Sequence, residues 1–182
     1  MGELEGVKVA VLVTNGFEEV ELVKPVEALK EAGASVAIVS PEKKIKAWDM
    51  TDWGNEYEAD TLLNETNPED FDALLLPGGV LNPDQLRLNN AALDFARHFV
   101  FNNKPIASIC HGPWLLAEIG SIRGKKLTSY PSIRTDLINA GAQWINQETV
   151  RDGLLITSRK PDDIPAFNKA MIAMFQQEII NV

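Results

Sequence analysis

Apolar residues fall into two kinds of run along this chain, and the two kinds alternate. Short continuous runs rich in Val, Ile and Leu end at glycine, proline or asparagine, which is typical of strands buried on both faces of a sheet. Longer stretches place apolar residues three or four positions apart, which is typical of helices with one buried face. The runs predict strands at residues 8–13, 35–39, 71–76, 105–109, 126–130, 144–150 and 154–158.

The longer stretches predict helices at residues 18–32, 90–101, 132–140 and 164–180, and one directly after the run that ends at Cys110. In the first of these, Gly33 ends the pattern. Pro25 lies inside it and is expected to bend the helix, because proline removes one amide donor. An Asp152-Gly153 turn is expected to join the last two strands.

Residues 42–67 follow neither pattern. Trp48, Trp53 and Tyr57 stand there among charged and polar side chains. We expect a short hairpin or an extended excursion over the surface.

The alternation of strands and helices predicts an α/β fold in which a mostly parallel sheet lies between two helical layers. A chain of 182 residues with 45% apolar residues can bury one sizeable core, so residues 1–182 are expected to form a single domain. In such folds, active residues collect at the carboxyl ends of the strands.

The charge and the cysteine content exclude several classes of protein. A net charge of −9 argues against binding to a nucleic-acid backbone, since phosphate contacts need a basic surface. One cysteine cannot form an internal disulfide, and two histidines with one cysteine are too few for a convincing metal site. The first residues resemble neither a signal peptide nor a membrane span, so a cytoplasmic protein without cofactor or metal is expected.

Cys110 is the only cysteine, and it ends the apolar run of the segment PIASICHGPW. A side chain at a sharp strand-to-helix turn projects out of the sheet, as in a nucleophile elbow. Helix amides and the neighbouring His111 are expected to favour its thiolate. The alternative is a buried, inert thiol, the usual state of a free cysteine.

Four separated pieces resemble the ThiJ/PfpI superfamily, within the class I glutamine amidotransferase-like fold. The pieces are GFEEVEL at residues 16–22, LPGG at 76–79, ASICHGP at 107–113, and LTSYP at 127–131 followed by NAGA at 139–142. The resemblance covers nearly the whole chain and is greatest to the PfpI branch. It implies a three-layer α/β/α sandwich with a flavodoxin-like sheet.

The resemblance assigns the nucleophile to Cys110 and the neighbouring base to His111. It matches Glu18 to a protonated carboxyl group that donates a hydrogen bond to the cysteine sulfur. Without the resemblance, Glu18 is equally well explained as a solvated carboxylate that complements a helix N-terminus.

Gly78 and Gly79 allow the backbone to approach a ligand and to direct amides at an oxyanion, although glycine pairs also form ordinary turns. The Gly79 amide, with that of His111, is the expected oxyanion hole. Asp84 matches a carboxylate that PfpI-like proteins contribute to the histidine of a neighbouring subunit, which implies a homo-oligomer built from dimers. The loop before Asp84 is one residue longer than in relatives, and Asp84 also suits a helix start.

Two aromatic residues complete the expected site. Tyr130 falls where another branch of the superfamily carries its histidine, and is expected to supply a hydroxyl to the pocket. Trp114 follows Cys110 by one helical turn and is expected to wall the substrate site, although such residues more often belong to a core. His98 is expected on the surface.

The chemistry expected from this set is attack by Cys110 on a carbonyl carbon. The resemblance implies a stress-protective glyoxalase that works without glutathione, or a deglycase of early glycation adducts, acting on a small carbonyl or glycated substrate. An intracellular cysteine peptidase is the alternative enzyme. A redox sensor or holding chaperone that uses Cys110 is the non-enzymatic alternative.

Overall fold

A computed structural model describes residues 2–180 and is built on one seven-stranded sheet. The strand order is β10-β11-β7-β6-β1-β2-β5, and every pairing is parallel except that of β10 with β11. The strands are β1 Lys8–Leu12, β2 Ser35–Ser40, β5 Thr61–Leu62, β6 Ala73–Leu76, β7 Ile106–Ile109, β10 Thr149–Asp152 and β11 Leu155–Ser158.

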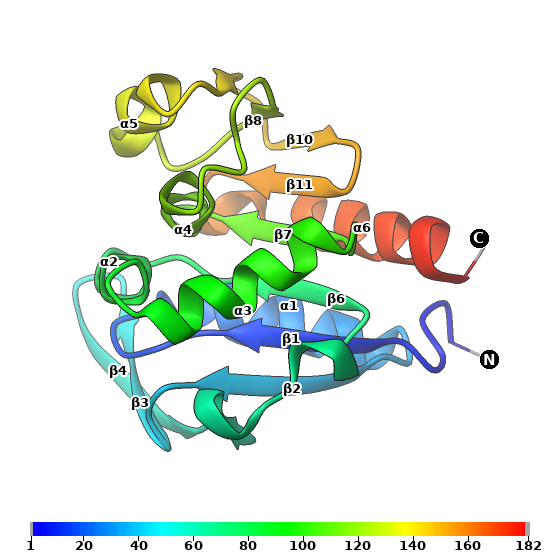
Figure 1. Ribbon diagram of the computed structural model, residues 1–182. Helices are drawn as coiled ribbons and strands as arrows, with labels where there is room; N and C mark the ends of the chain where they lie inside the picture. Colours follow the sequence, from blue (N-terminus) through cyan, green and yellow to red (C-terminus); the bar gives the residue numbers. More distant parts are fainter. Residues whose placement is uncertain (1, 181–182) are drawn as a thin grey trace.

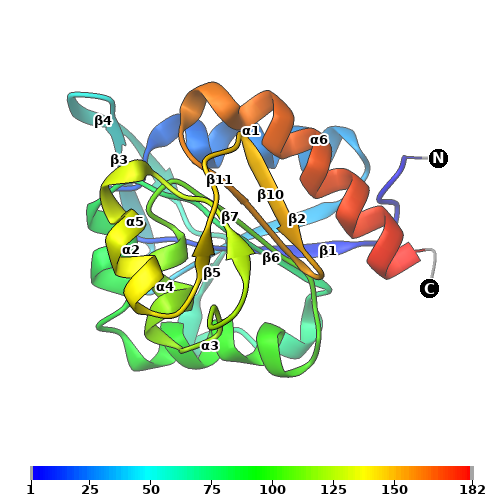
Figure 2. The same ribbon diagram turned by 90° about the horizontal axis from the view of Figure 1, so that it is seen from above.

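Helices cover both faces of this sheet, so the fold has three layers, as predicted (Figure 1). Seen from above, α1 (Glu19–Glu31) and α6 (Ile164–Phe175) lie on one side, and α3 (Asn90–Phe101) and α4 (Pro113–Glu118) on the other (Figure 2). Two further short helices, α2 (Leu81–Leu86) and α5 (Arg134–Asn139), lie near the carboxyl edge of the sheet.

Side chains of successive strand residues enter two separate cores, because they point to opposite faces of the sheet. In β1, Val9 and Val11 join the core under α1 and α6, whereas Ala10 and Leu12 join the core under α3 and α4. Both faces of the central strands are therefore apolar, which explains the continuous runs in the sequence.

The irregular region forms the expected hairpin. Strands β3 (Lys44–Asp49) and β4 (Asp52–Glu58) pair in antiparallel fashion and project beside the carboxyl end of β1. The hairpin is tied to the loop after β1 by backbone bonds from Gly16 N to Lys46 O (2.8 Å) and from Trp48 N to Phe17 O (2.7 Å).

Some predicted boundaries are wrong. The strand expected at 126–130 ends early, because only β8 (Lys126–Leu127) pairs, with β9 (Gln143–Trp144). The strand expected at 144–150 begins at Thr149 as β10, because its antiparallel partner β11 ends at Ser158, which pairs with Thr149. The helix expected at 132–140 opens with a 3-10 turn, η3 (Pro131–Ile133).

The other helices differ less from expectation. Helix α1 continues through Pro25, and the last helix changes from α to π geometry over η5 (Gln176–Ile180). Helix α2 was not predicted, because its six residues are too few for a periodic pattern. Three 3-10 turns complete the described chain: η1 (Leu63–Glu65), η2 (Pro68–Asp70) and η4 (Pro161–Asp163). No helix within residues 2–180 has the length and apolar character needed to span a membrane.

Candidate active site

Three loops meet at the carboxyl edge of the sheet, following β1, β6 and β7. These strands are adjacent and parallel, so residues far apart in the sequence come together there. The loops bring Gly16, Gly79 and Cys110 to one cavity of about 570 Å³. Its other lining residues are Glu18, Glu21, Trp48, Met50, Val80, Leu81, His111, Tyr130, Lys160, Pro161 and Asp162.

Cys110 lies at the floor of this cavity in a strained backbone conformation. Its φ is 63°, in the left-handed region that residues other than glycine seldom adopt. Only 6% of the residue is exposed. The turn depends on Gly112, where a Cβ atom would clash with Ser108 and with the carbonyl of Leu76. The sharp strand-to-helix turn predicted from the sequence is therefore present.

His111 lies beside the thiol and contacts four neighbouring side chains. Its Nδ1 is 3.2 Å from the Cys110 sulfur, and its Nε2 is 3.1 Å from the Ser132 hydroxyl oxygen. The imidazole stacks on Tyr130 at 5.0 Å and meets Trp114 edge-on at 5.1 Å. Burial lowers the pKa of His111 to about 4, so the ring is neutral near pH 7.

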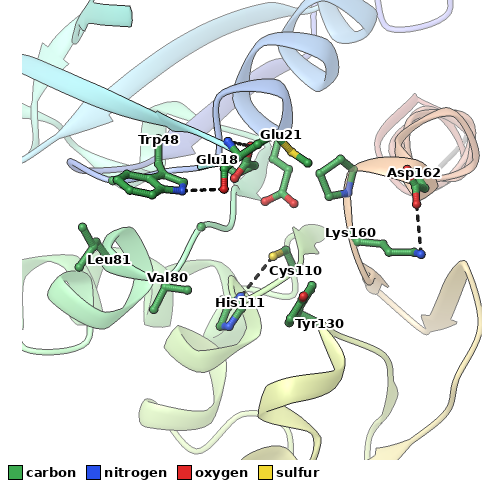
Figure 3. Close-up of a pocket in the computed structure, with 14 residues that line it drawn as sticks. Glu18, Glu21, Trp48, Val80, Leu81, Cys110, His111, Tyr130, Lys160 and Asp162 are labelled. Atoms are coloured by element: carbon green, nitrogen blue, oxygen red, sulfur yellow. Dashed lines mark hydrogen bonds and ion pairs between the residues drawn. The ribbon is translucent and has the colours of Figure 1, made fainter. Parts of the chain in front are cut away.

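The carboxyl group beside Cys110 belongs to Glu21. The Glu21 side chain is fully buried and points from α1 toward the thiol (Figure 3). Its Oε2 accepts a hydrogen bond from Gly78 N at 3.1 Å, while Oε1 has no partner among the hydrogen bonds of the described residues. Burial raises the pKa of Glu21 to about 8, so the group is mostly a neutral acid at pH 7.

Glu18, which the resemblance matched to this position, lies at the mouth of the cavity instead. Its Oε1 accepts a hydrogen bond from Met50 N at 3.1 Å, and its backbone bridges to Trp48. Partial burial raises the pKa of Glu18, and the Met50 amide acts in the opposite direction. The prediction that Glu18 contacts the sulfur is thus wrong. The carboxyl group beside the sulfur belongs to Glu21, which follows Glu18 by three residues, close to one helical turn.

The thiol is not activated in the way the sequence suggested. Burial raises the pKa of Cys110 well above its usual value, and the Glu21 carboxyl acts in the same direction. Hydrogen bonds from the Gly79 and His111 amides oppose this shift without overcoming it. Helix α4 and His111 therefore do not produce a resting thiolate; the thiol and a neutral imidazole lie side by side.

The glycine pair after β6 is required by close packing on both sides. A Cβ on Gly78 would clash with Glu21 and Cys110, and one on Gly79 would clash with the backbone of Gly16 and Phe17. Gly79 also has φ 77°, which favours glycine. The Gly79 amide faces the sulfur, as does that of His111, which is the arrangement expected of an oxyanion hole.

The remaining predicted residues lie in different places. Tyr130 lines the cavity. Trp114 does not; it packs behind His111, and its Nε1 donates a hydrogen bond to Asp136 Oδ2 at 3.0 Å. Asp84 is exposed on α2 and does not line the cavity of its own chain. His98 is half-buried, not fully on the surface.

Three residues whose side chains hydrogen-bond to His111 or to the glycine pair were missed in the sequence. Glu21 shares one helical face with the buried Pro25 and Leu29, at steps of four residues, and a carboxyl group on a buried stripe is a signal for function. Ser132 and Asn82 gave no such signal. Asn82 is buried on α2, and its hydrogen bond with Thr14 N depends on the adjacency of β1 and β6.

Comparisons with known proteins agree with this architecture. The model of the DJ-1/PfpI family matches residues 7–174. A deglycase of Pyrococcus horikoshii is 43% identical over 169 residues, which cover 93% of this chain and 99% of the relative. General stress protein 18 of Bacillus subtilis is 42% identical over 175 residues, which cover 94% of this chain and 99% of the relative.

One similar solved structure is a two-domain protein from Anabaena variabilis with a DJ-1/ThiJ/PfpI-like and a ferritin-like domain. It aligns with a TM-score of 0.86 at 34% identity, over 92% of this chain and 47% of that chain. The present chain thus spans about half the length of that protein.

Proposed function

Because the chain belongs to the DJ-1/PfpI family, some of whose members are named deglycases, we propose that it is a protective enzyme that uses Cys110 against small reactive carbonyl compounds. The substrates are α-oxoaldehydes or the early adducts that these aldehydes form with amines and thiols. One observation carries the proposal: the Cys110 thiol lies 3.2 Å from a neutral imidazole, with a buried acid and two amides around the same sulfur.

The first step is addition of the thiol to the aldehyde carbon. The sulfur–carbon bond forms as the thiol proton passes to His111 Nδ1, and the carbonyl oxygen takes up negative charge. The Gly79 and His111 amides stabilise this oxyanion. Protonation of the oxyanion then gives a hemithioacetal. A neutral histidine suits this step, because it can accept the proton.

For an α-oxoaldehyde, two further steps complete the reaction. A base removes the proton from the former aldehyde carbon, and a proton is returned to the neighbouring carbon, which gives a thioester of a 2-hydroxy acid. Water then attacks the thioester, the sulfur–carbon bond breaks and the thiol regains its proton. The net reaction adds one water molecule to the substrate. His111 and Glu21 are the groups beside the sulfur that can carry these protons.

The shape of the cavity favours small substrates over peptides. The β3–β4 hairpin contributes Trp48 and Met50 to its mouth, and the volume is about 570 Å³. A cysteine peptidase needs an open groove for an extended chain, which gives this alternative less support. A redox sensor needs a readily ionised thiol, and burial raises the pKa of Cys110 instead.

Assembly into a homo-oligomer is part of the proposal. Asp84 is exposed on α2, and Val80, Leu81 and Leu88 around it are exposed apolar residues. Association through this surface would bury those side chains and bring Asp84 toward a neighbouring site. Sedimentation should then show a dimer or larger species, and a fully active monomer would remove Asp84 from the mechanism.

The decisive experiment compares wild type with Cys110→Ala on methylglyoxal without glutathione, on a glycated thiol and on a fluorogenic peptide. We expect consumption of the first two by wild type and none by Cys110→Ala. Turnover that survives the substitution would exclude the mechanism. Cleavage of the peptide alone would favour the peptidase. Accumulation of a Cys110 sulfinic acid under mild peroxide, without turnover, would favour the sensor.

A further inference from the structure

Asn82 is a buried polar residue whose contacts join the glycine pair to the loop after β1. Its side chain is fully buried, and all of its hydrogen bonds go to the backbone. Oδ1 accepts from Thr14 N at 2.8 Å. Nδ2 donates to the carbonyl oxygens of Pro77 at 3.1 Å and Gly78 at 3.0 Å. An amide donor on one side and two carbonyl acceptors on the other permit only this orientation of the side chain.

The two carbonyls that Asn82 binds belong to consecutive peptide groups. In a trans peptide, the carbonyl of one residue and the N–H of the next point in opposite directions. The group with the Pro77 carbonyl carries the Gly78 N–H, which donates to Glu21 Oε2 at 3.1 Å. The group with the Gly78 carbonyl carries the Gly79 N–H, which faces the Cys110 sulfur. Asn82 holds both peptides from the side opposite the catalytic groups.

Such anchoring matters most at glycine. A Gly-Gly segment has access to many backbone conformations, so its peptide groups can rotate unless other contacts fix them. If the second peptide rotated, its carbonyl oxygen would replace the N–H beside the sulfur and would repel an oxyanion. We infer that Asn82 is a positioning residue that fixes the Gly79 N–H toward the oxyanion and the Gly78 N–H toward Glu21. This inference rests on the proposed function for its kinetic consequence.

The test uses Asn82→Ala and Asn82→Asp. The aspartate keeps an acceptor for Thr14 N but, when ionised, lacks the donor to the two carbonyls. For both variants we expect kcat on methylglyoxal to fall about tenfold or more, with KM changed by less than about threefold, because the lost contact acts on the oxyanion. Asn168→Ala is the matched control: Asn168 is half-buried and donates to the Lys24 carbonyl at 3.3 Å, away from the cavity.

A second measurement is independent of turnover. The rate of Cys110 alkylation by iodoacetamide, followed against pH, reports the ionisation of the thiol. Loss of the fixed Gly79 donor should move this profile to higher pH. The variants keep the Glu21 and His111 side chains, the titratable groups beside the sulfur, and weaken only the Gly78 N–H contact to Glu21. Asn168→Ala should keep the wild-type profile.

The outcomes separate the two proposals. If wild type turns over no carbonyl compound, the proposed function fails, and the alkylation profile still tests Asn82. Folded variants with wild-type kcat and an unmoved profile would overturn the inference, even if their melting temperatures fall. If truncation to alanine prevents folding, Asn82→Asp, which keeps the acceptor for Thr14 N, is read in its place.

Discussion

The floor and the mouth of the cavity contain the same kind of group in different surroundings. Glu21 at the floor is fully buried, with one oxygen bound to Gly78 N and the other unpartnered among the described residues. Glu18 at the mouth is half-buried and accepts from Met50 N on the hairpin. The two carboxyl groups are three residues apart, so the difference in their chemistry comes from burial and not from sequence context.

Exchange of each acid for its amide tests this comparison most strongly. Glu21→Gln keeps the shape and an acceptor for Gly78 N but cannot donate an ionisable proton. We expect kcat/KM for methylglyoxal to fall about 100-fold, within the range that general acid–base groups contribute. The matched Glu18→Gln should change it by less than about threefold. Equal losses in the two variants would contradict the assignment of different roles.

The pH dependence of stability gives the next largest effect. Burial raises the pKa of Glu21 from 4.5 to about 8, so the folded protein keeps a proton that the unfolded chain has released. The free energy of unfolding contributed by Glu21 therefore falls as the pH rises through this range. His111, whose pKa burial lowers from 6.5 to about 4, acts in the opposite sense and only below pH 6.5.

Between pH 6.5 and 8 the Glu21 effect is therefore unopposed by His111. Wild type should lose on the order of 2 kcal/mol of stability over this interval relative to Glu21→Gln. Urea unfolding at the two pH values measures the difference. Parallel pH profiles for wild type and variant would show that Glu21 is already ionised at pH 6.5.

Ser132 provides a smaller test on the histidine side of the floor. Ser132→Ala removes the partner of His111 Nε2, so the imidazole loses one contact that orients it. We expect kcat to fall about fivefold and Ser132→Thr, which keeps the hydroxyl, to retain most of the activity. A larger loss in Asp84→Asn than in Ser132→Ala would instead identify the neighbouring subunit's carboxylate as the main partner of this nitrogen.

A substitution at the mouth of the cavity should have the smallest effect on activity, and it should act through substrate binding. The Trp48 indole lines the cavity and donates to the Met50 carbonyl at 3.1 Å, which supports the hairpin turn. Trp48→Ala should raise KM about threefold and leave kcat nearly unchanged. A fall in kcat with constant KM would mean that the hairpin takes part in the chemical steps.

The sequence predicted the layers and most of the elements because the pattern of buried positions is local. The runs 8–13 and 71–76 are continuous since both faces of β1 and β6 are covered. The sequence also identified the residues that follow strand ends, namely Cys110, His111, Gly78 and Gly79. Contacts between loops could not be predicted from the sequence, because they join residues that are far apart in the chain. Asn82 meets Thr14, which is far from it in the chain, because β1 and β6 are neighbours in the sheet.

Glu21 was missed for a different reason. Helix α1 begins beside the cavity, and a shift of three residues moves a side chain from the mouth of the cavity to the sulfur. A family likeness that covers both glutamates does not choose between them. The buried stripe through Glu21, Pro25 and Leu29 identifies Glu21 as the inward-facing glutamate, once the helix is known to lie against the sheet.

Selection for stability and selection for activity act in opposite directions at Cys110. A left-handed backbone costs a residue with a side chain about 1–2 kcal/mol, and glycine would avoid most of that cost. In a screen for thermal tolerance alone, glycine would therefore be enriched at this position and the protein would lose its proposed nucleophile. A cysteine in a backbone conformation suited to glycine is a marker for chemistry that can be searched for in other folds.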